Sequence, residues 1–259
     1  FFSTNNIIDY NDKEIYQLKN NSFSLNRSNE IDSFFLPVIL GNYSNSYGTI
    51  SSEQFYHHLF GNNPSGSFSD YYKEVSYNKF YPTGDVYGWI NSDKLKSEAV
   101  EDPHSYVLSL LNVSDQNINF SQYDNDGPDN IPNSGDDDGI VDGLIVVYPG
   151  NGADSYIDND NIWPFMSYLW GDNEFITDDI SVNGEYMRIS KFALCPEKYG
   201  NNIREIGVYA HEFGHILGLP DLYDISQNFD DYDPMHDYHN GIGNWGLMAG
   251  GSWLGNYGD

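Results

Sequence analysis

The sequence predicts a single α+β domain, and three observations support this class. The chain has 259 residues, of which 39% are hydrophobic and 16% aromatic, so it can bury a core. Short apolar runs typical of strands are interleaved with stretches that have helical spacing. The sequence contains no internal repeat and no clear interdomain linker, so one domain is expected rather than two.

The first half of the chain alternates strand and helix signals. The apolar run FFLPVIL at 34–40 predicts a buried strand. Ser52-Glu53 opens a helical stretch that Gly61 closes, and residues 67–73 predict another short helix. Aromatic and polar residues alternate over 80–90, which predicts a strand with turns.

The elements that follow are an amphipathic helix, a loop and a strand. The helix is predicted over 93–111, where Pro103 breaks it or begins its second half. An acidic loop at 123–142 leads into the β-branched strand 143–150.

The last part of the chain predicts a hairpin or meander over 165–189, with turns at Gly171-Asp172 and Asn183-Gly184. A strong helix follows over 202–217 and should end at Gly218. Residues 220–259 are rich in Gly, Asp and Tyr and should be mostly loop.

The charge and the cysteine content exclude several functions. The chain has 39 acidic and 11 basic side chains, a formal net charge of −28. Such a surface repels phosphate, so we expect no nucleic-acid partner and no binding to an anionic membrane. The only cysteine, Cys195, cannot form an internal disulfide bond or a thiolate metal site, and we expect it to be buried. A metal would therefore be bound by His, Asp and Glu.

The most informative motif is His211-Glu212-x-x-His215 on a predicted buried helix. Two His four residues apart lie on one helix face, so both imidazoles can reach one zinc ion. Glu212 could hold and deprotonate a zinc-bound water. Asp221 lies three residues after Gly218, where the chain can turn back and supply a third ligand. Asp224 is the competitor for that role.

Several segments together are similar to one known family. They are FLPVILGNYSN, SGSFSDYYKEVSYNKF, TGDVYGWI, YDNDG…DDDGIVDGLIVVYPG, IWP, AHEFGHILGLPDLYD and GIGNWGLMAGGSWLG, which cover roughly residues 34–256. In this order they resemble the immune inhibitor A family of secreted zinc metallopeptidases. The resemblance implies a metzincin-like catalytic domain with a twisted mixed sheet, a backing helix, an active-site helix and a Met turn.

The resemblance also implies roles for individual residues. His211 and His215 correspond to zinc ligands, Glu212 to the general base and Met248 to the residue of the Met turn. Where many metzincins have a third His, this chain has Asp221, an anionic ligand that should make the bound water slightly less acidic. By analogy with other metzincins, Tyr257 is a candidate donor to the oxyanion.

The expected function is that of a secreted, extracellular endopeptidase that acts as a monomer on proteins or peptides. An amidase or esterase using the same zinc chemistry is an alternative, and so is a calcium-stabilised binding or adhesion module with a vestigial zinc site. On this interpretation residues 1–33 are an N-terminal arm or residual pro-segment. Residues 34–259 are the catalytic domain, which we expect to be truncated at its C-terminal end.

The acidic loop predicts a calcium site. Asp124-x-Asp126-Gly and Asp138-Gly-Ile-Val-Asp142 resemble the two halves of a calcium-binding loop separated by an insertion. Ca²⁺ takes six to eight oxygen ligands, which alternating Asp side chains can supply. Asp138 is favoured as the middle ligand over two alternatives, Asp136 and Asp137. A second, weaker candidate is the group Asp221, Asp224, Asp230, Asp231 and Asp233.

Overall fold

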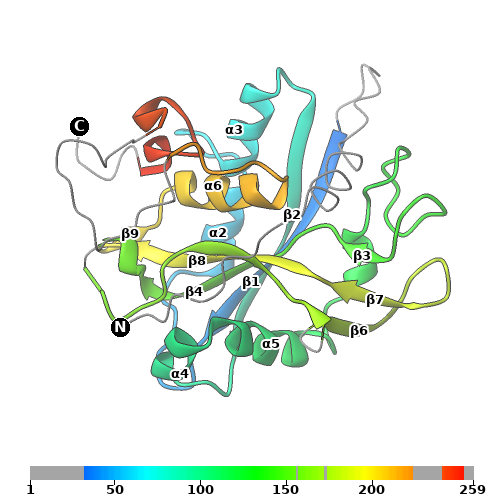
Figure 1. Ribbon diagram of the computed structural model, residues 1–259, viewed down its shortest axis with the longest axis horizontal. Helices are drawn as coiled ribbons and strands as arrows, with labels where there is room; N and C mark the ends of the chain where they lie inside the picture. The colour runs from blue at the N-terminus through cyan, green and yellow to red at the C-terminus, as the bar shows by residue number, and fades with distance from the viewer. Residues whose placement is uncertain (1–31, 156, 172–173, 224–240, 254–259) are drawn as a thin grey trace. The chain divides into compact units, whose positions relative to one another are not determined.

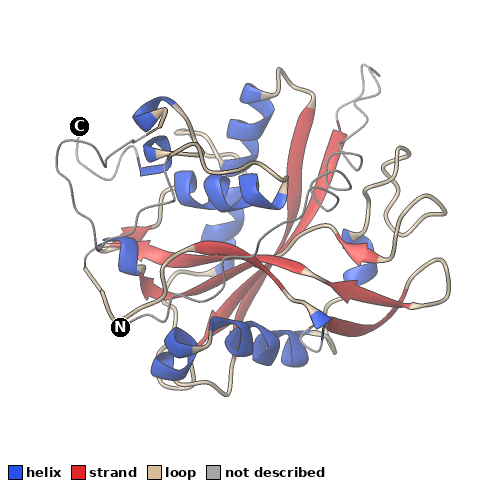
Figure 2. Ribbon diagram, viewed as in Figure 1, coloured by secondary structure: helices blue, strands red, loops and turns tan. Residues whose placement is uncertain are grey.

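The main sheet of the protein is mixed and strongly twisted (Figure 2). A computed structural model describes residues 32–155, 157–171, 174–223 and 241–253. The strand order is β2-β1-β4-β8-β5, and β9 pairs with β8. The pairs β1–β2, β1–β4 and β4–β8 are parallel, whereas β5 and β9 run antiparallel to β8. These strands are β1 (Asp32–Asn42), β2 (Phe80–Asn91), β4 (Ile145–Asn151), β5 (Phe165–Tyr168), β8 (Lys191–Tyr199) and β9 (Asn202–Ile203).

Helices cover both faces of this sheet (Figure 1). Alternate residues of a strand point to opposite faces, so Val38 of β1 belongs to one core cluster and Ile39 to the other. The Val38 cluster also contains residues of α2, α3 and α6, and the Ile39 cluster contains residues of α5. The helices are α2 (Ser52–Leu59), α3 (Phe68–Val75), α4 (Lys96–Glu101), α5 (Pro103–Ser114) and α6 (Ile206–Ile216).

Side-chain caps fix where several helices begin. Ser51 and Gln54 form a capping box at the start of α2, and Ser67 and Asp70 form another at α3. Asp102 accepts a hydrogen bond from the Ser105 amide at the start of α5. Proline 103 is the first residue of that helix, where its missing N–H costs nothing. The predicted helix 93–111 is thus two helices, and the role predicted for Pro103 is confirmed.

A second, smaller sheet has the order β3-β7-β6, with β3 parallel and β6 antiparallel to β7. Short 3₁₀ turns connect the larger elements. The strands of the smaller sheet are β3 (Ile140–Val141), β6 (Phe175–Ile180) and β7 (Tyr186–Ile189). The 3₁₀ turns are η1 (Phe120–Tyr123), η2 (Ala153–Ser155), η4 (Gly243–Trp245) and η5 (Gly250–Trp253).

The structure differs from the sequence-based expectations at two places before the metal motif. The helix predicted over 202–217 begins at Ile206, because Asn202–Ile203 forms β9 instead. The sequence pattern predicted no element over Lys191–Tyr199, which form the internal strand β8. Pro196 lowers the strand signal because it lacks an N–H, and it lies where the β4–β8 register becomes irregular.

Other expectations are confirmed or concern residues outside those that the structure describes. The α+β class is confirmed, and so are the elements predicted over 34–40, 52–61, 67–73, 80–90 and 143–150. Within 165–189, β6 and β7 form a hairpin, whereas β5 pairs with β8. Asp172 and most of 220–259 lie outside the described residues. Cys195 is fully buried. Of the arm predicted at 1–33, only Asp32 and Ser33 are described, and they begin β1. Among the described residues, every helix is too short or too polar to cross a membrane.

Glu197 on β8 connects three segments of the chain. Its side chain is buried, and Oε1 accepts hydrogen bonds from the Thr49 amide at 2.6 Å and the Ile50 amide at 2.7 Å. Oε2 accepts from the Gly150 amide at 3.0 Å. A buried donor that loses its partner costs free energy, so removing this carboxylate should loosen the loop at Thr49–Ile50 and the end of β4.

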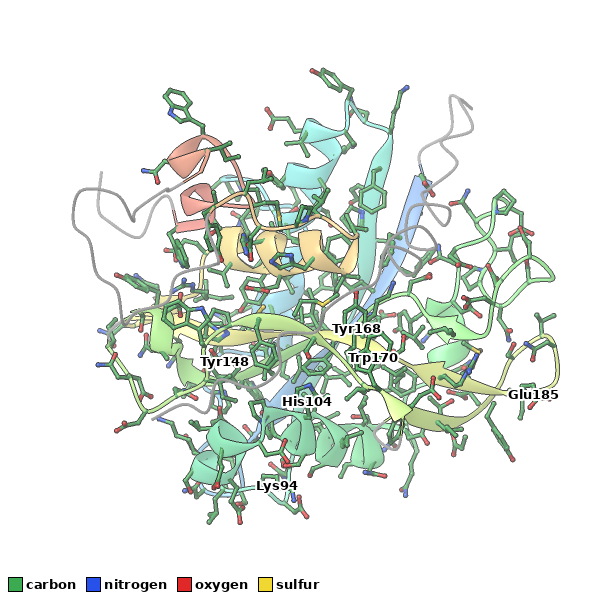
Figure 3. All side chains as sticks on the ribbon, viewed as in Figure 1. Lys94, His104, Tyr148, Tyr168, Trp170 and Glu185 are labelled. Atoms are coloured by element: carbon green, nitrogen blue, oxygen red, sulfur yellow. The ribbon has the colours of Figure 1, made fainter. Side chains whose placement is uncertain are left out.

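We predict that Glu197→Ala lowers the free energy of unfolding by at least ~2 kcal/mol. Urea denaturation measures this loss. The matched control is Glu185→Ala, because Glu185 is exposed at the β6–β7 turn (Figure 3). Equal stability of the two variants would contradict the assigned role of Glu197.

Candidate metal centre

Helix α6 is anchored to the sheet by contacts that leave its other face free for the metal motif. Phe213 packs edge-on against Phe34 of β1 and Phe68 of α3, with ring centroids 5.1 and 5.2 Å apart. The Tyr209 hydroxyl donates to the Pro196 carbonyl at 2.7 Å, and the Tyr72 hydroxyl donates to the Ala210 carbonyl at 2.6 Å. The His211-Glu212-x-x-His215 motif is therefore held on a helix that cannot easily shift.

The chain reverses direction directly after α6. Gly218 has φ +87°, a left-handed conformation that costs little for glycine. The Gly218 amide donates to the His215 carbonyl and the Leu219 amide to the Gly214 carbonyl, both at 2.9 Å. This pattern is a Schellman motif, and it brings Asp221 back beside the helix. The end predicted for the helix at Gly218 is confirmed.

Both imidazoles use Nδ1 to bind backbone oxygens. The His211 Nδ1 atom lies 2.8 Å from the Leu247 carbonyl, and the His215 Nδ1 atom lies 2.8 Å from the Leu219 carbonyl. A carbonyl oxygen can only accept, so Nδ1 must carry the proton in each ring. In the neutral rings Nε2 therefore presents a lone pair, as a metal ligand requires.

The three predicted ligand atoms converge on one point. The Nε2 atoms of His211 and His215 are 3.2 Å apart, and Asp221 Oδ1 lies 3.2 Å from the first and 3.4 Å from the second. Asp221 Oδ1 is buried and accepts no hydrogen bond. A tetrahedral site with ligands at ~2.0–2.1 Å from zinc has ligand–ligand edges of ~3.3 Å. The donor set and its spacing fit a zinc ion.

Glu212 lies beside this group and is buried. Burial raises the pKa of its carboxyl to about 8, and the charge of Asp221 acts in the same direction. The backbone N–H of Met166 on β5 donates to Glu212, and this hydrogen bond offsets a smaller part of the rise in its pKa. A carboxyl with a raised pKa beside a metal site is suited to accept a proton.

Met248 lies in a turn beneath α6, where the Ala249 amide donates to the Gly246 carbonyl at 3.2 Å. It is buried, and its sulfur packs closely against Gly214 of the motif. The same turn supplies the Leu247 carbonyl that holds His211. The segment thus supports the metal centre from below and contributes one backbone acceptor.

Tyr223 belongs to the site, although its sequence position alone did not predict this. Its hydroxyl donates to the carboxylate of Asp221, and burial together with the charge of Asp221 raises its pKa to about 12. Its position two residues after a predicted ligand was the signal that could have revealed it. Asp224 and Tyr257 lie outside the described residues, and so do Asp230, Asp231 and Asp233.

The acidic loop brings three of its four predicted ligands together. Carboxylate oxygens of Asp124, Asp126 and Asp142 lie within 4.8 Å of one another. Asp124 is fully buried, and its Oδ1 has no hydrogen-bond partner. Burial raises the pKa of Asp124 to about 7 and that of Asp142 to about 8. Carboxyls packed this closely need a cation if all are to ionise.

The remaining acidic residues of the loop have other partners. Asp138 is exposed, and its Oδ1 accepts from the Ile140 amide at 2.9 Å, so it lies outside the group of three. Asp137 accepts from the Gly127 and Ser134 amides at 2.9 and 2.6 Å. Asp136 accepts from the Ser134 hydroxyl.

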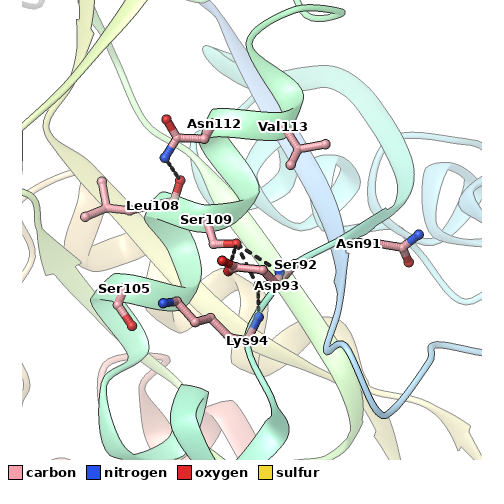
Figure 4. A pocket seen from close by; sticks show the side chains of 9 residues that line it. All are labelled: Asn91, Ser92, Asp93, Lys94, Ser105, Leu108, Ser109, Asn112 and Val113. Atoms are coloured by element: carbon pink, nitrogen blue, oxygen red, sulfur yellow. Dashed lines mark hydrogen bonds between the residues drawn. The ribbon is translucent and has the colours of Figure 1, made fainter.

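A surface depression elsewhere is lined by residues of β2, α5 and the segment before α4, most of them polar (Figure 4). Its volume is about 660 Å³, and it is widely open to solvent. The Ser109 hydroxyl donates to Asp93 Oδ1 at 2.7 Å, and the Ser92 hydroxyl donates to Ser109 at 3.0 Å. These polar groups pair with one another, and α5 lies across the sheet from α6. This depression is therefore separate from the metal motif.

Comparisons with known proteins identify the family. The model of the immune inhibitor A peptidase M6 catalytic domain matches residues 7–259. The chain belongs to the immune inhibitor A peptidase M6 family. The family that the motifs indicated is thus confirmed, and with it the class of a metallopeptidase.

Two curated relatives have low identity to this chain. Immune inhibitor A of Bacillus thuringiensis subsp. alesti is 27% identical over 219 residues, and the match covers 73% of this chain and 29% of that protein. Pre-pro-metalloprotease PrtV of Vibrio cholerae serotype O1 is 29% identical over 222 residues, and the match covers 83% of this chain and 22% of that protein. The matches therefore span less than a third of either relative's length.

Proposed function

We propose that this chain is the catalytic domain of a secreted zinc-dependent endopeptidase that hydrolyses peptide bonds of proteins. One observation carries the proposal: two imidazole lone pairs and a carboxylate oxygen lie 3.2–3.4 Å from one another without a proton donor between them. This spacing is that of zinc ligands in a tetrahedral site that leaves one position open. Membership of the peptidase family supports the same conclusion.

His211, His215 and Asp221 would hold the metal. Zinc bound there would supply a Lewis acid that polarises the scissile carbonyl and lowers the pKa of water. Glu212 is placed to accept the proton of the attacking water and to pass it to the leaving amine. Met248, which packs below the ligands, does no chemistry in this mechanism. We further propose that the domain is metzincin-like, with α6 as the active-site helix, α5 as the backing helix and residues 246–249 as the Met turn.

The alternatives use the same residues differently. A binding module with a vestigial zinc site has no need of Glu212 beside three correctly spaced ligands, so the intact set argues against it. An amidase or esterase would share the metal chemistry, but the peptidase family and the name of the Vibrio metalloprotease favour proteolysis. Extracellular location and a monomeric state are part of the proposal.

We also propose a structural calcium site formed by Asp124, Asp126 and Asp142. Its support is the buried Oδ1 atom of Asp124, which lacks a partner. Asp138 is exposed beside this group, and its negative charge raises the pKa of Asp124. Asp138 remains the proposed fourth ligand of the loop.

The first prediction concerns zinc and the general base. Purified protein should contain about one zinc per chain. His215→Ala should lose the metal, because one of three protein ligands is gone. Glu212→Ala should keep the metal and lose hydrolysis of casein or gelatin. Elemental analysis and digestion with and without chelator measure both effects. Absence of zinc uptake by the wild type, or full activity of Glu212→Ala, would refute the assignment.

The second prediction separates the two candidate third ligands. Asp221→Ala should weaken zinc binding at least ~tenfold, because Oδ1 of Asp221 faces both Nε2 atoms. Asp224→Ala should affect stability more than zinc affinity. Asp221→His should retain zinc, since imidazole can serve in the same place. Zinc titration of these variants decides the matter, and loss of metal only in Asp224→Ala would reverse the assignment.

The third prediction concerns calcium. A ligand that binds only the folded state at a hundredfold excess over its Kd adds about 2.7 kcal/mol to the free energy of unfolding. A few millimolar Ca²⁺ should therefore raise the melting temperature relative to EGTA, and Asp142→Ala should remove most of this gain. The matched control is Asp136→Ala, whose carboxylate is held by Ser134. Identical melting curves of the wild type in Ca²⁺ and EGTA would count against the site.

A further inference from the structure

The segment 246–253 determines where one zinc ligand is held. Its Leu247 carbonyl accepts the Nδ1 proton of His211 at 2.8 Å, and Met248 packs against Gly214 of the same helix. The second half of the segment is η5, which lies beside the amino-terminal end of α6 (Figure 1). A shift of this segment along the helix would therefore move the acceptor that orients the His211 ring.

The far end of the segment is anchored by a buried ion pair. The indole Nε1 of Trp253 donates to Asp154 Oδ2 at 3.1 Å. Arg204, the residue two before α6, donates from Nη2 to the same oxygen. The side chains of Asp154 and Arg204 are both fully buried. The ion pair and the indole thus share one carboxylate oxygen, and hydrogen bonds to a carboxylate are stronger than those to a neutral acceptor.

A close backbone approach adds to this anchor. Gly207 lies in the first turn of α6, directly against the carbonyl of Ser252. A Cβ atom at position 207 would lie 2.2 Å from that oxygen, so only glycine permits the contact. The anchor at Trp253 and the contact at Gly207 therefore hold η5 against the helix from two neighbouring points.

We propose that Asp154 and Trp253 are positioning residues for the metal centre. By fixing η5 against α6, they hold the Leu247 carbonyl at the distance that orients His211 with Nε2 toward His215 and Asp221. This inference rests on the proposed zinc function. Asp154 lies between β4 and β5, far from the motif in sequence. Groups that orient metal ligands typically change metal affinity 10–100-fold when they are removed.

The test is the zinc affinity of Trp253→Phe, which keeps an aromatic ring but removes the indole N–H. The matched control is Trp89→Phe. Trp89 is also partly buried, and its Nε1 donates to a backbone carbonyl, that of Ile50, at 2.7 Å, on the α2 side of the sheet. Both variants lose one indole hydrogen bond, so both should lower the melting temperature. Zinc competition titrations, made where both variants are folded, should give about tenfold weaker binding only for Trp253→Phe.

Equal zinc affinity of the wild type and both variants would overturn the positioning role and leave the proposed function intact. A wild type that takes up no zinc would overturn both proposals. If Trp253→Phe does not fold, Gly207→Ala decides, because the added methyl group must displace Ser252 and should also weaken zinc binding. Unchanged zinc affinity of a folded Gly207→Ala protein would equally overturn the role.

Discussion

The convergence of three electron-pair donors is the constraint on which the rest of this structure depends. The Nδ1 protons of His211 and His215 are committed to backbone carbonyls, so each Nε2 atom must present a lone pair to the other and to the Asp221 carboxylate. Such an arrangement is repulsive without a positive charge at its centre. The fold must hold it together, and a bound cation would turn the repulsion into attraction.

The framework around the centre meets this demand with backbone atoms as much as with side chains. The Schellman turn at Gly218 directs both the Leu219 carbonyl and Asp221 toward the helix. The turn beneath α6 supplies the Leu247 carbonyl. Hydrogen bonds from Tyr209 and Tyr72 fix α6 to β8 and α3. These contacts fix the three proposed ligands relative to the sheet, and groups that are held in place lose less freedom when they bind.

Much of this architecture could be predicted from the sequence, because it depends on local patterns. Helical spacing placed His211 and His215 on one face, and Gly218 predicted the turn that returns Asp221. Strand β8 could not be predicted in the same way, because Pro196 argues against a central strand until its irregular register with β4 is known. The helix start was predicted four residues early, since Asn202–Ile203 pairs with β8, a tertiary contact that overrides local propensity.

The supporting partners of the site were the least predictable part. Carbonyls such as Leu219 and Leu247 have no signature in side-chain identity. Asp154 reaches Trp253 across 99 positions of the chain, a pairing that only the folded structure reveals. In the acidic loop the insertion forms turns of its own and leaves Asp138 exposed, which spacing alone did not indicate.

X-ray absorption at the zinc edge of the purified protein tests the central claim most directly. The account predicts a four-coordinate shell of nitrogen and oxygen atoms at ~2.0–2.1 Å, with the outer-shell scattering of two imidazole rings. In His211→Ala or His215→Ala protein loaded with excess zinc, the outer-shell scattering should correspond to one imidazole ring. An all-oxygen shell, or a wild-type spectrum without imidazole scattering, would contradict the account.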